Sequence, residues 1–345
     1  MIETFLLEEN EKWDECVRKL PNYEPFYLSD YLKAFELQGS GEAILIVYTN
    51  DADYAINTVF RRDIGEDIHF QGKLTCGKYY DLSSPYGYGG FIGDISDEQK
   101  LIQEWNQYCV DNGYICEFVR FHLFSKYYKY FDGIVECRTK NVVRSLTMPL
   151  DDIWMEFKQK VRKNVKKAIS YNLDIVYDPD GRYLDDFLRI YYGTMKRTEA
   201  KEDFYFSKEF FETLNRMKEN VMYFHVRHNG KIVSTELVLY GDENCYSYLG
   251  GTDREYFDMR PNDFLKYEII KWAKEKGLVN FVLGGGYGAD DGIFKYKSCL
   301  APNGIQNFYI GKKIFNKTQY EELIKKREKE NAKCKESNFF PLYRG

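Results

Sequence analysis

Short apolar segments alternate with polar and glycine-containing stretches along this chain, and their order predicts strands joined by helices. In the first half, residues 44–48 and 54–60 have the apolar pattern of strands. A helical pattern follows at 98–111, and Gly113 ends it before an apolar strand at 114–121. The first half therefore predicts a sheet with a helix beside it.

The second half repeats this order of strand, helix, glycine and strand. Asn229-Gly230 separates two apolar runs, which is typical of a tight β-hairpin, and Gly277 ends the last helix. The predicted elements are strands at 222–226, 232–240 and 245–249, a helix at 262–276 and a strand at 280–283. Because 345 residues are about twice an ordinary domain, we expect one architecture used twice, in a mixed α/β (α+β) fold.

A helix with two unlike faces is predicted between the halves, over 152–171. Its apolar stripe recurs every three or four residues and comprises Ile153, Phe157, Val161, Val165 and Ala168. Its other face carries six cations within ten residues, namely Lys158, Lys160, Arg162, Lys163, Lys166 and Lys167. Such a face is either solvated or holds phosphate groups. We expect this helix at the junction of two domains that meet near residue 150.

Three further helices are predicted on the C-terminal side of this segment. Two of them cover 183–196 and 207–218. The third, over 318–335, is highly charged and has few apolar positions. We therefore expect it to pack lightly on the outside and to carry no chemistry.

Composition and charge narrow the class of protein. With 44% hydrophobic residues and no apolar run longer than 43–47, the chain is expected to be globular and to lack a transmembrane span. The first residues carry acids where a secretory signal carries basic residues, which predicts a cytoplasmic protein without integral membrane contact. A net charge of −5 argues against long-range attraction of the whole molecule to nucleic acid or anionic lipid, so DNA is not expected as a partner and any anion site must be local.

The spacing of cysteine and histidine predicts no metal site. The eight cysteines contain no C-x-x-C pair. His225 and His228 lie three apart in a strand-like run, so their side chains are expected on opposite faces.

A glycine-rich segment follows the last predicted strand. Gly284, Gly285, Gly286 and Tyr287 begin a formal match to a dinucleotide-binding loop. Acids follow at Asp290 and Asp291, and no acid occurs from 292 to 320 to hold a ribose. The next segment reads as strand or turn, without a helix N-terminus for a pyrophosphate. We therefore interpret the glycines as a strand exit where backbone approaches a ligand or a neighbouring strand.

Lysines and tyrosines near glycine supply the candidate chemistry. Lys295 and Lys297 lie two apart and would share one face of an extended segment, where two ammonium groups suit an anion or a developing oxyanion. Spacing alone favours two solvated lysines on an edge strand. Tyr86 and Tyr88 lie in a glycine-permitted loop, which either presents hydroxyl groups or is a simple tight turn. Arg197 closes a tyrosine-rich helix and could bind phosphate.

Taken together, these motifs resemble the FemAB-like branch of the GNAT acyltransferase superfamily. The resemblance covers the chain up to about residue 317 and rests on the order and spacing of its motifs. These are Y-G-Y-G-G (86–90), V-R-K-N-V-K-K-A (161–168), Y-Y-x-T-M-x-R (191–197), L-G-G-T-D (249–253), P-N-D-F-L-K-Y-E (261–268), and G-G-G-Y-G followed by F-K-Y-K-S. It implies two tandem GNAT-like domains, each a mixed, largely antiparallel sheet flanked by helices. We assign them to 1–150 and 151–317, with 318–345 as a charged helix and tail.

The resemblance also implies roles for individual residues. The family's aromatic-Lys-x-x-aromatic-small pattern falls on Tyr296, Lys297, Leu300 and Ala301, although Leu300 replaces the usual aromatic residue. Lys297 would then stabilise the reacting acyl group, with Lys295 as the alternative. Arg197 and Lys33 match positions of the family that hold phosphates of the acceptor, and Arg162 of the basic helix face is a further candidate for this role. Candidates for the proton acceptor are Asp253, Asp290 and a water molecule.

The implied reaction is transfer of an acyl or aminoacyl group from an activated donor to an amine of a cell-envelope or glycan precursor, which is nucleotide-linked or lipid-linked. The co-substrate is aminoacyl-tRNA or acyl-CoA, with no tightly bound cofactor. The usual glycine-containing CoA loop is replaced by 259–263, which favours the Fem-like donor. Two alternatives remain: an acetyl-CoA-dependent N-acetyltransferase acting on an amino sugar or small amine, and a non-catalytic RNA- or glycan-binding protein.

Overall fold

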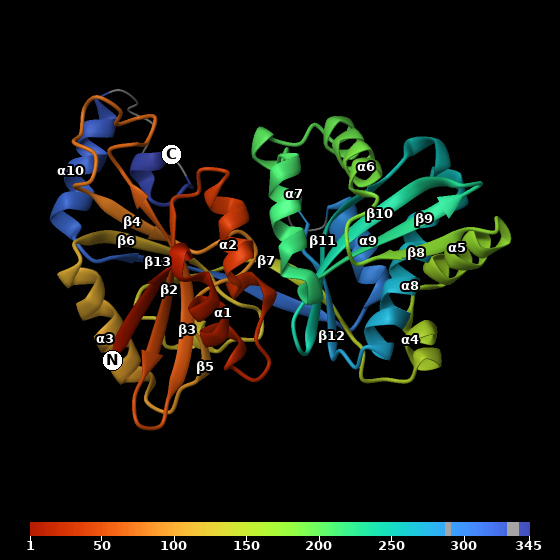
Figure 1. Cartoon of the computed structure of the whole chain (residues 1–345), viewed down its shortest axis with the longest axis horizontal. Helices are drawn as coiled ribbons and strands as arrows, with labels where there is room; N and C mark the ends of the chain where they lie inside the picture. The colour runs from red at the N-terminus through yellow and green to blue at the C-terminus, as the bar shows by residue number, and fades with distance from the viewer. Residues whose placement is uncertain (287–290, 330–337) are drawn as a thin grey trace. The chain divides into compact units, whose positions relative to one another are not determined.

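The computed structural model describes residues 1–286, 291–329 and 338–345 (Figure 1). Its contacts divide the chain into two units. Unit 1 comprises Met1–Leu20, Phe26–Arg138 and Phe308–Gly345, and unit 2 comprises Pro21–Pro25 and Thr139–Asn307. The chain therefore leaves unit 1 after Arg138 and returns to it at Phe308.

The strands of unit 1 pair mostly antiparallel. Among the described strands of this unit, only β4 and β6 form a parallel pair. Its strands, in spatial order, are β1 (Ile2–Leu6), β2 (Glu42–Thr49), β3 (Tyr54–Asp63), β4 (Tyr80–Ser83), β6 (Tyr114–Arg120) and β13 (Ile305–Ile314), with β5 (Ile92–Asp94) also paired to β3. Its helices are α1 (Asn10–Arg18), α2 (Ser29–Glu36), α3 (Glu98–Asp111) and α10 (Lys317–Glu328).

The strands of unit 2 also pair mostly antiparallel, with β11 and β12 as a parallel pair. The spatial order of its strands is β7 (Ile134–Ser145), β12 (Asn280–Gly284), β11 (Asn244–Thr252), β10 (Lys231–Tyr240), β9 (Val221–His228) and β8 (Asp174–Asp178). Its helices are α4 (Leu150–Glu156), α5 (Gln159–Ser170), α6 (Leu184–Arg197), α7 (Lys208–Leu214), α8 (Pro261–Glu275) and α9 (Gly292–Leu300). A core of side chains from α4, α5, α8 and the sheet fills this unit.

The strand pairing confirms the predicted fold class, a mixed and largely antiparallel sheet flanked by helices. The structure groups residues 308–345 with unit 1, which differs from the sequence-based division at 150 and 317. That each unit is a separate GNAT-like domain stays a prediction.

Turns and helix ends that depend on backbone sterics were predicted correctly from local residues. The hairpin between β9 and β10 turns at Asn229 and Gly230, whose φ angles of 48° and 80° are those of a primed two-residue turn. Gly113 and Gly277 adopt φ of 69° and 82° directly after α3 and α8. Both are the left-handed positions that glycine occupies at helix ends.

The predicted single helix over 152–171 is wrong, because the chain folds there as α4 and α5. Phe157 and Lys158 between them have extended ψ angles of 139° and 145°. Arg162 reaches back over this break, and its Nη1 donates to the carbonyls of Met155 and Phe157 at 2.6 Å each. The predicted apolar stripe is nevertheless buried, because the break leaves both helices packed on the same core.

Two other expectations about C-terminal elements are also wrong. Residues 292–300 form the helix α9, and not a strand or turn, because the Asp291 carboxylate accepts a hydrogen bond from the Phe294 N–H and caps it. The α10 helix is not lightly packed. Its residues Tyr320, Leu323 and Ile324 are buried in a cluster that includes Ile64 of unit 1.

No helix in the described ranges is both long and apolar enough to span a bilayer.

Candidate active site

An opening between two parallel strands is the main irregularity of the sheet in unit 2. β11 and β12 are paired only from Asn244–Asn280 to Tyr246–Val282, yet β11 continues to Thr252 and β12 to Gly284. Beyond Tyr246 and Val282 the outer edge of each strand still pairs, β11 with β10 and β12 with β7. The facing backbone edges beyond this point are therefore available to a ligand.

Lys297 lies at the end of β12, beside the glycine-rich exit. Its Nζ donates a hydrogen bond to the Gly285 carbonyl at 2.7 Å. Gly284 has φ of 79°, and a Cβ added there would lie 3.3 Å from the same Nζ. The positive φ favours glycine at this position, and a Cβ there would also crowd the end of the lysine side chain. Lys297 therefore lies directly against Gly284 and Gly285.

Lys295 does not share a face with Lys297, contrary to the expectation for an extended segment. Both residues lie in α9, where a separation of two residues turns side chains about 200° apart. Lys295 is exposed, whereas Lys297 is partly buried. The α9 helix also supplies the helix N-terminus whose absence was expected after the glycine segment, but the Asp291 carboxylate already occupies it.

Lys297 has a lowered pKa because it is buried. It lowers the pKa of the Lys297 ammonium to about 8, and the nearby Lys266 cation lowers it further. Glu236 and Asp291 oppose this shift. At neutral pH the amine is therefore still mostly protonated, but it can lose its proton far more readily than a surface lysine.

A buried ion pair lies under the opening, and the sequence analysis missed it. Lys266 Nζ of α8 lies 2.5 Å from Glu236 Oε1 of β10 and 2.6 Å from Ser247 Oγ. Ser247 is the first β11 residue beyond the pairing with β12. The sequence nevertheless held an indication of this pair. Glu236 lies within a strand-like apolar run and Lys266 lies on an apolar helix, and either charge is costly to bury without a partner.

The N-terminus of α8 is poorly suited to a pyrophosphate. The helix begins at Pro261, which lacks an N–H, after Arg260 in a left-handed conformation with φ of 60°. Asp263 of the first turn is buried and accepts from Asn164 Nδ2 at 3.2 Å. Burial raises the Asp263 pKa to about 6. An incoming phosphate would meet this carboxylate in place of the free backbone donors that usually bind it.

The predicted phosphate-binding and proton-accepting residues of unit 2 have other contacts. Arg162 donates to the backbone of α4, as described above. Arg197 Nη1 lies 3.4 Å from the Thr252 carbonyl, and its guanidinium stacks on the Phe257 ring. Asp253 forms ion pairs with Arg189 at 3.4 Å and Lys231 at 3.3 Å. The roles predicted for these residues stay predictions.

The remaining predicted residues lie in unit 1. Tyr88 is 7% exposed and packs edge-on against Phe26, whereas Tyr86 is 39% exposed. Between them Gly87 has φ of 86°, and a Cβ there would lie 2.9 Å from the Phe26 ring. Lys33 forms an ion pair with Glu36 at 2.8 Å. Of the predicted loop, Tyr287 lies outside the described residues, as does the alternative acid Asp290.

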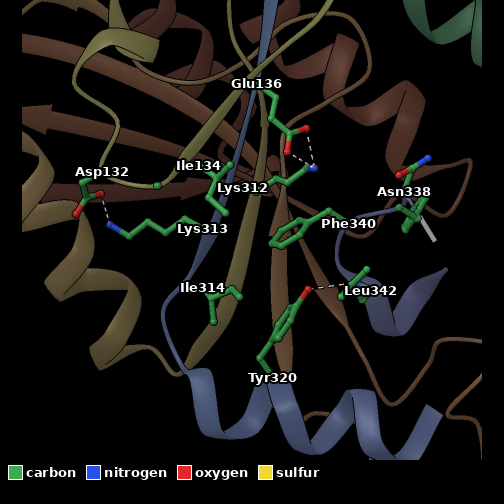
Figure 2. A pocket seen from close by; sticks show the side chains of 12 residues that line it. Asp132, Ile134, Glu136, Lys312, Lys313, Ile314, Tyr320, Asn338, Phe340 and Leu342 are labelled. Atoms are coloured by element: carbon green, nitrogen blue, oxygen red, sulfur yellow. Dashed lines mark hydrogen bonds and ion pairs between the residues drawn. The ribbon is translucent and has the colours of Figure 1, made fainter. Parts of the chain in front are cut away.

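Unit 1 also contains a pocket of about 570 Å³, shown in Figure 2. Its polar side has two cations, each with an acid. Lys312 Nζ lies 2.8 Å from both carboxylate oxygens of Glu136, and Lys313 is paired with Asp132. Tyr320 of α10 and the apolar side chains Phe340 and Leu342 of the C-terminal segment line another side. Because both lysines are neutralised, this pocket offers no free charge for an anionic group.

Comparison with known proteins supports the acyltransferase reading of unit 2. Residues 155–298 match the family model described as "Acetyltransferase (GNAT) domain". An 86-residue stretch is 27% identical to "Lipid II:glycine glycyltransferase" from Staphylococcus haemolyticus. That stretch covers 25% of this chain and 20% of the relative, so the match spans about a fifth of the relative's length.

Solved structures extend the likeness to nearly the whole chain. The crystal structure of FemX matches with a TM-score of 0.69 at 14% identity, over 93% of this chain and 99% of that chain. L-PGS from Bacillus licheniformis matches with a TM-score of 0.56 at 14% identity, over 92% and 95% of the respective chains. At such identities the structural matches establish the fold alone. The family model, the glycyltransferase relative and this shared fold together confirm the resemblance to the FemAB-like branch of the GNAT superfamily.

Proposed function

This chain carries a GNAT domain of the FemAB-like kind, and from that premise we propose that it transfers an acyl or aminoacyl group to an amine of a cell-envelope or glycan precursor. The observation that carries the proposal is the Lys297 ammonium, held at the glycine exit of β12 beside the opening between β11 and β12. The relative named for glycyl transfer to lipid II supports a lipid-linked acceptor.

In this proposal, the acceptor amine attacks the ester or thioester carbonyl of the donor. A C–N bond forms, the carbonyl oxygen becomes an oxyanion, and the carbon–oxygen or carbon–sulfur bond of the donor then breaks. An ammonium has three donors, and Lys297 gives one to the Gly285 carbonyl. The other two are left to hold the oxyanion.

The proton lost by the amine ends on the leaving oxygen or sulfur. Asp253, Asp290 and a water molecule remain the candidate carriers. Asp253 would have to give up its ion pair with Arg189 or Lys231 to take this proton, so a water or the leaving group itself is the simpler route.

Aminoacyl-tRNA is the donor that the α8 N-terminus favours. Pro261 removes a backbone donor there, and the buried Asp263 carboxylate opposes a pyrophosphate. The rival donor is acetyl-CoA, which the name of the matching family model favours. It would make the protein an N-acetyltransferase acting on an amino sugar or small amine.

Transfer assays with each donor test the proposal. The purified chain is incubated with a lipid-linked or nucleotide-linked precursor and either aminoacyl-tRNA or acetyl-CoA, and the new amide is detected by mass spectrometry. We expect aminoacylated precursor with charged tRNA and no acetylated product. Acetylation alone would establish the rival donor. Binding of RNA or glycan with no transfer from either donor would instead indicate the non-catalytic alternative.

Replacing Lys297 with Ala should lower single-turnover transfer by about 10²–10³-fold, because a preorganised charge at the oxyanion is lost. Lys295→Ala and Lys312→Ala are the matched controls, since the first lies on the same helix and the second is paired with Glu136 in unit 1. Both should transfer at wild-type rates. If Lys297→Ala does so too, the role of Lys297 is wrong; loss in Lys295→Ala alone would move the role to Lys295.

A further inference from the structure

The solvent face of α5 is a dense and uncompensated patch of positive charge. The helix contains no acid, and the chain there carries five exposed lysines: Lys158, Lys160, Lys163, Lys166 and Lys167. Within the described ranges none of the five takes part in a salt bridge. The α10 helix is a useful contrast, because its lysines alternate with Glu321 and Glu322 and one of them pairs with Glu321.

The acids closest to α5 in the chain do not neutralise this patch. Glu156, two residues before Lys158, forms an ion pair with Arg144 at 2.6 Å. Asp263 faces Lys160 from α8, but it is buried and bonded to Asn164. The patch therefore presents a net positive field to whatever approaches α5.

Large apolar side chains are exposed along one border of the patch. Met155 at the end of α4 is 65% exposed, and Ile169 near the end of α5 is 52% exposed. The bond from Arg162 to the Met155 carbonyl places Met155 along the edge of α5 that carries Arg162. Ile169 follows Arg162 by seven residues, two helical turns, and so lies on the same edge. Tyr171, just after the helix, is 38% exposed.

We propose that this surface, the five lysines with Met155 and Ile169, docks the protein on an anionic phospholipid bilayer. Clustered lysines are drawn to the negative surface of such a bilayer, and adjacent apolar side chains enter the boundary between headgroups and acyl chains. Phosphate groups of RNA would satisfy the lysines, but RNA-binding surfaces use stacked aromatic or guanidinium planes and leave exposed aliphatic chains without a role.

Docking of this kind is peripheral and independent of the transfer chemistry. Each lysine near an anionic surface strengthens binding by about fivefold, so five together can hold a protein whose net charge is −5. The interaction should weaken with salt, because the screening length shrinks as ionic strength rises. Docking would bring the proposed active site of unit 2 close to acceptors that are carried by the membrane.

Co-sedimentation of the full chain with lipid vesicles tests the inference. The vesicles contain phosphatidylcholine alone or with about a third phosphatidylglycerol as the anionic lipid. We expect binding to the anionic vesicles only. Lys163→Gln/Lys166→Gln/Lys167→Gln should weaken it by about a hundredfold, and Met155→Gln/Ile169→Gln should weaken it without changing its dependence on salt. The charge-matched control is Lys325→Gln/Lys326→Gln/Lys329→Gln, on and just after α10, which should bind as the wild type does.

Circular dichroism of each variant separates loss of the surface from loss of the fold. Equal binding by the wild type and the α5 triple variant would overturn the proposal, as would the absence of binding to anionic vesicles at low salt. The proposal would also be overturned if no form bound vesicles, the wild type bound an RNA hairpin and the α5 triple variant did not. That result would assign the surface to RNA. None of these outcomes depends on transfer activity, so they are distinct from failure of the proposed function.

Discussion

Burial of single ionisable side chains decides much of the chemistry proposed for this protein. Lys297 is the clearest case, since burial and Lys266 lower its pKa to about 8. If the protonated amine holds the oxyanion, transfer should fall about tenfold per pH unit above 8. The measurement is the pH dependence of single-turnover transfer, in which Lys297→Ala should lack this fall and Lys295→Ala should keep it. A rate that rises through pH 8 because of Lys297 would make it a proton acceptor instead.

Glu117 of β6 makes a separate prediction about stability. It is fully buried, it accepts from Trp105 Nε1 at 3.1 Å, and its Oε1 has no partner among the described residues. Burial raises its pKa to about 7 from an ordinary value of 4.5. The folded state then holds a proton that the unfolded state loses, so this contribution to stability is complete below pH 4.5 and is lost as the pH rises through 7.

Replacing Glu117 with Gln keeps the acceptor for Trp105 and removes the buried charge. At pH 8 the free energy of unfolding should rise by about 1–3 kcal/mol, and near pH 4 it should change little. Urea denaturation across this pH range provides the measurement. A variant less stable than the wild type at pH 8 would mean that the charged form of Glu117 is stabilised in the fold.

At the scale of elements, the Glu236–Lys266 pair joins β10 to α8 beneath the opening. Both side chains are almost completely buried. Lys266→Met leaves the Glu236 carboxylate without its partner and should cost about 3–5 kcal/mol of unfolding free energy. Glu236→Gln/Lys266→Met removes both charges and should cost clearly less. Equal losses in the single and double variants would show that packing, and not charge pairing, dominates there.

At the scale of the whole molecule, the C-terminal segment completes unit 1. Tyr320, Leu323, Ile324 and Tyr343 are buried with Ile64, Phe70, Ile115 and Cys116. Arg344 also pairs with Asp67 at 2.7 Å and with the fully buried Asp81 at 2.8 Å. Residues far apart in the chain thus share one core.

Deleting residues 318–345 should therefore destabilise unit 1 strongly. Four buried side chains account for about 6 kcal/mol of burial, which corresponds to a fall of about 10 °C or more in Tm. Thermal unfolding of the deletion variant provides the measurement, with Lys325→Gln/Lys326→Gln on the exposed side of α10 as the control that should melt as the wild type does. An unchanged Tm in the deletion variant would mean that α10 contributes little to stability, as the sequence analysis expected from its high charge.

The amino-acid sequence by itself determined the features that depend on a few adjacent residues. Asn229-Gly230 and the glycines after α3 and α8 set turns and helix ends, because only such residues adopt a positive φ cheaply. The order of motifs was also enough to indicate the GNAT resemblance and the reactive lysine candidate. The extended reading of 292–300 failed because two lysines two apart suit a strand, whereas the Asp291 cap and tertiary packing favour a helix.

Only the tertiary structure decided which distant residues meet. Three features depend on segments that lie 30 or more residues apart in the chain. They are the pairing of Glu236 with Lys266, the grouping of 308–345 with unit 1, and the opening between β11 and β12. A periodic pattern reports which face of an element is buried, but not what covers that face. The charge state of Lys297 depends on that covering, because its pKa is set by burial and by a lysine on another helix.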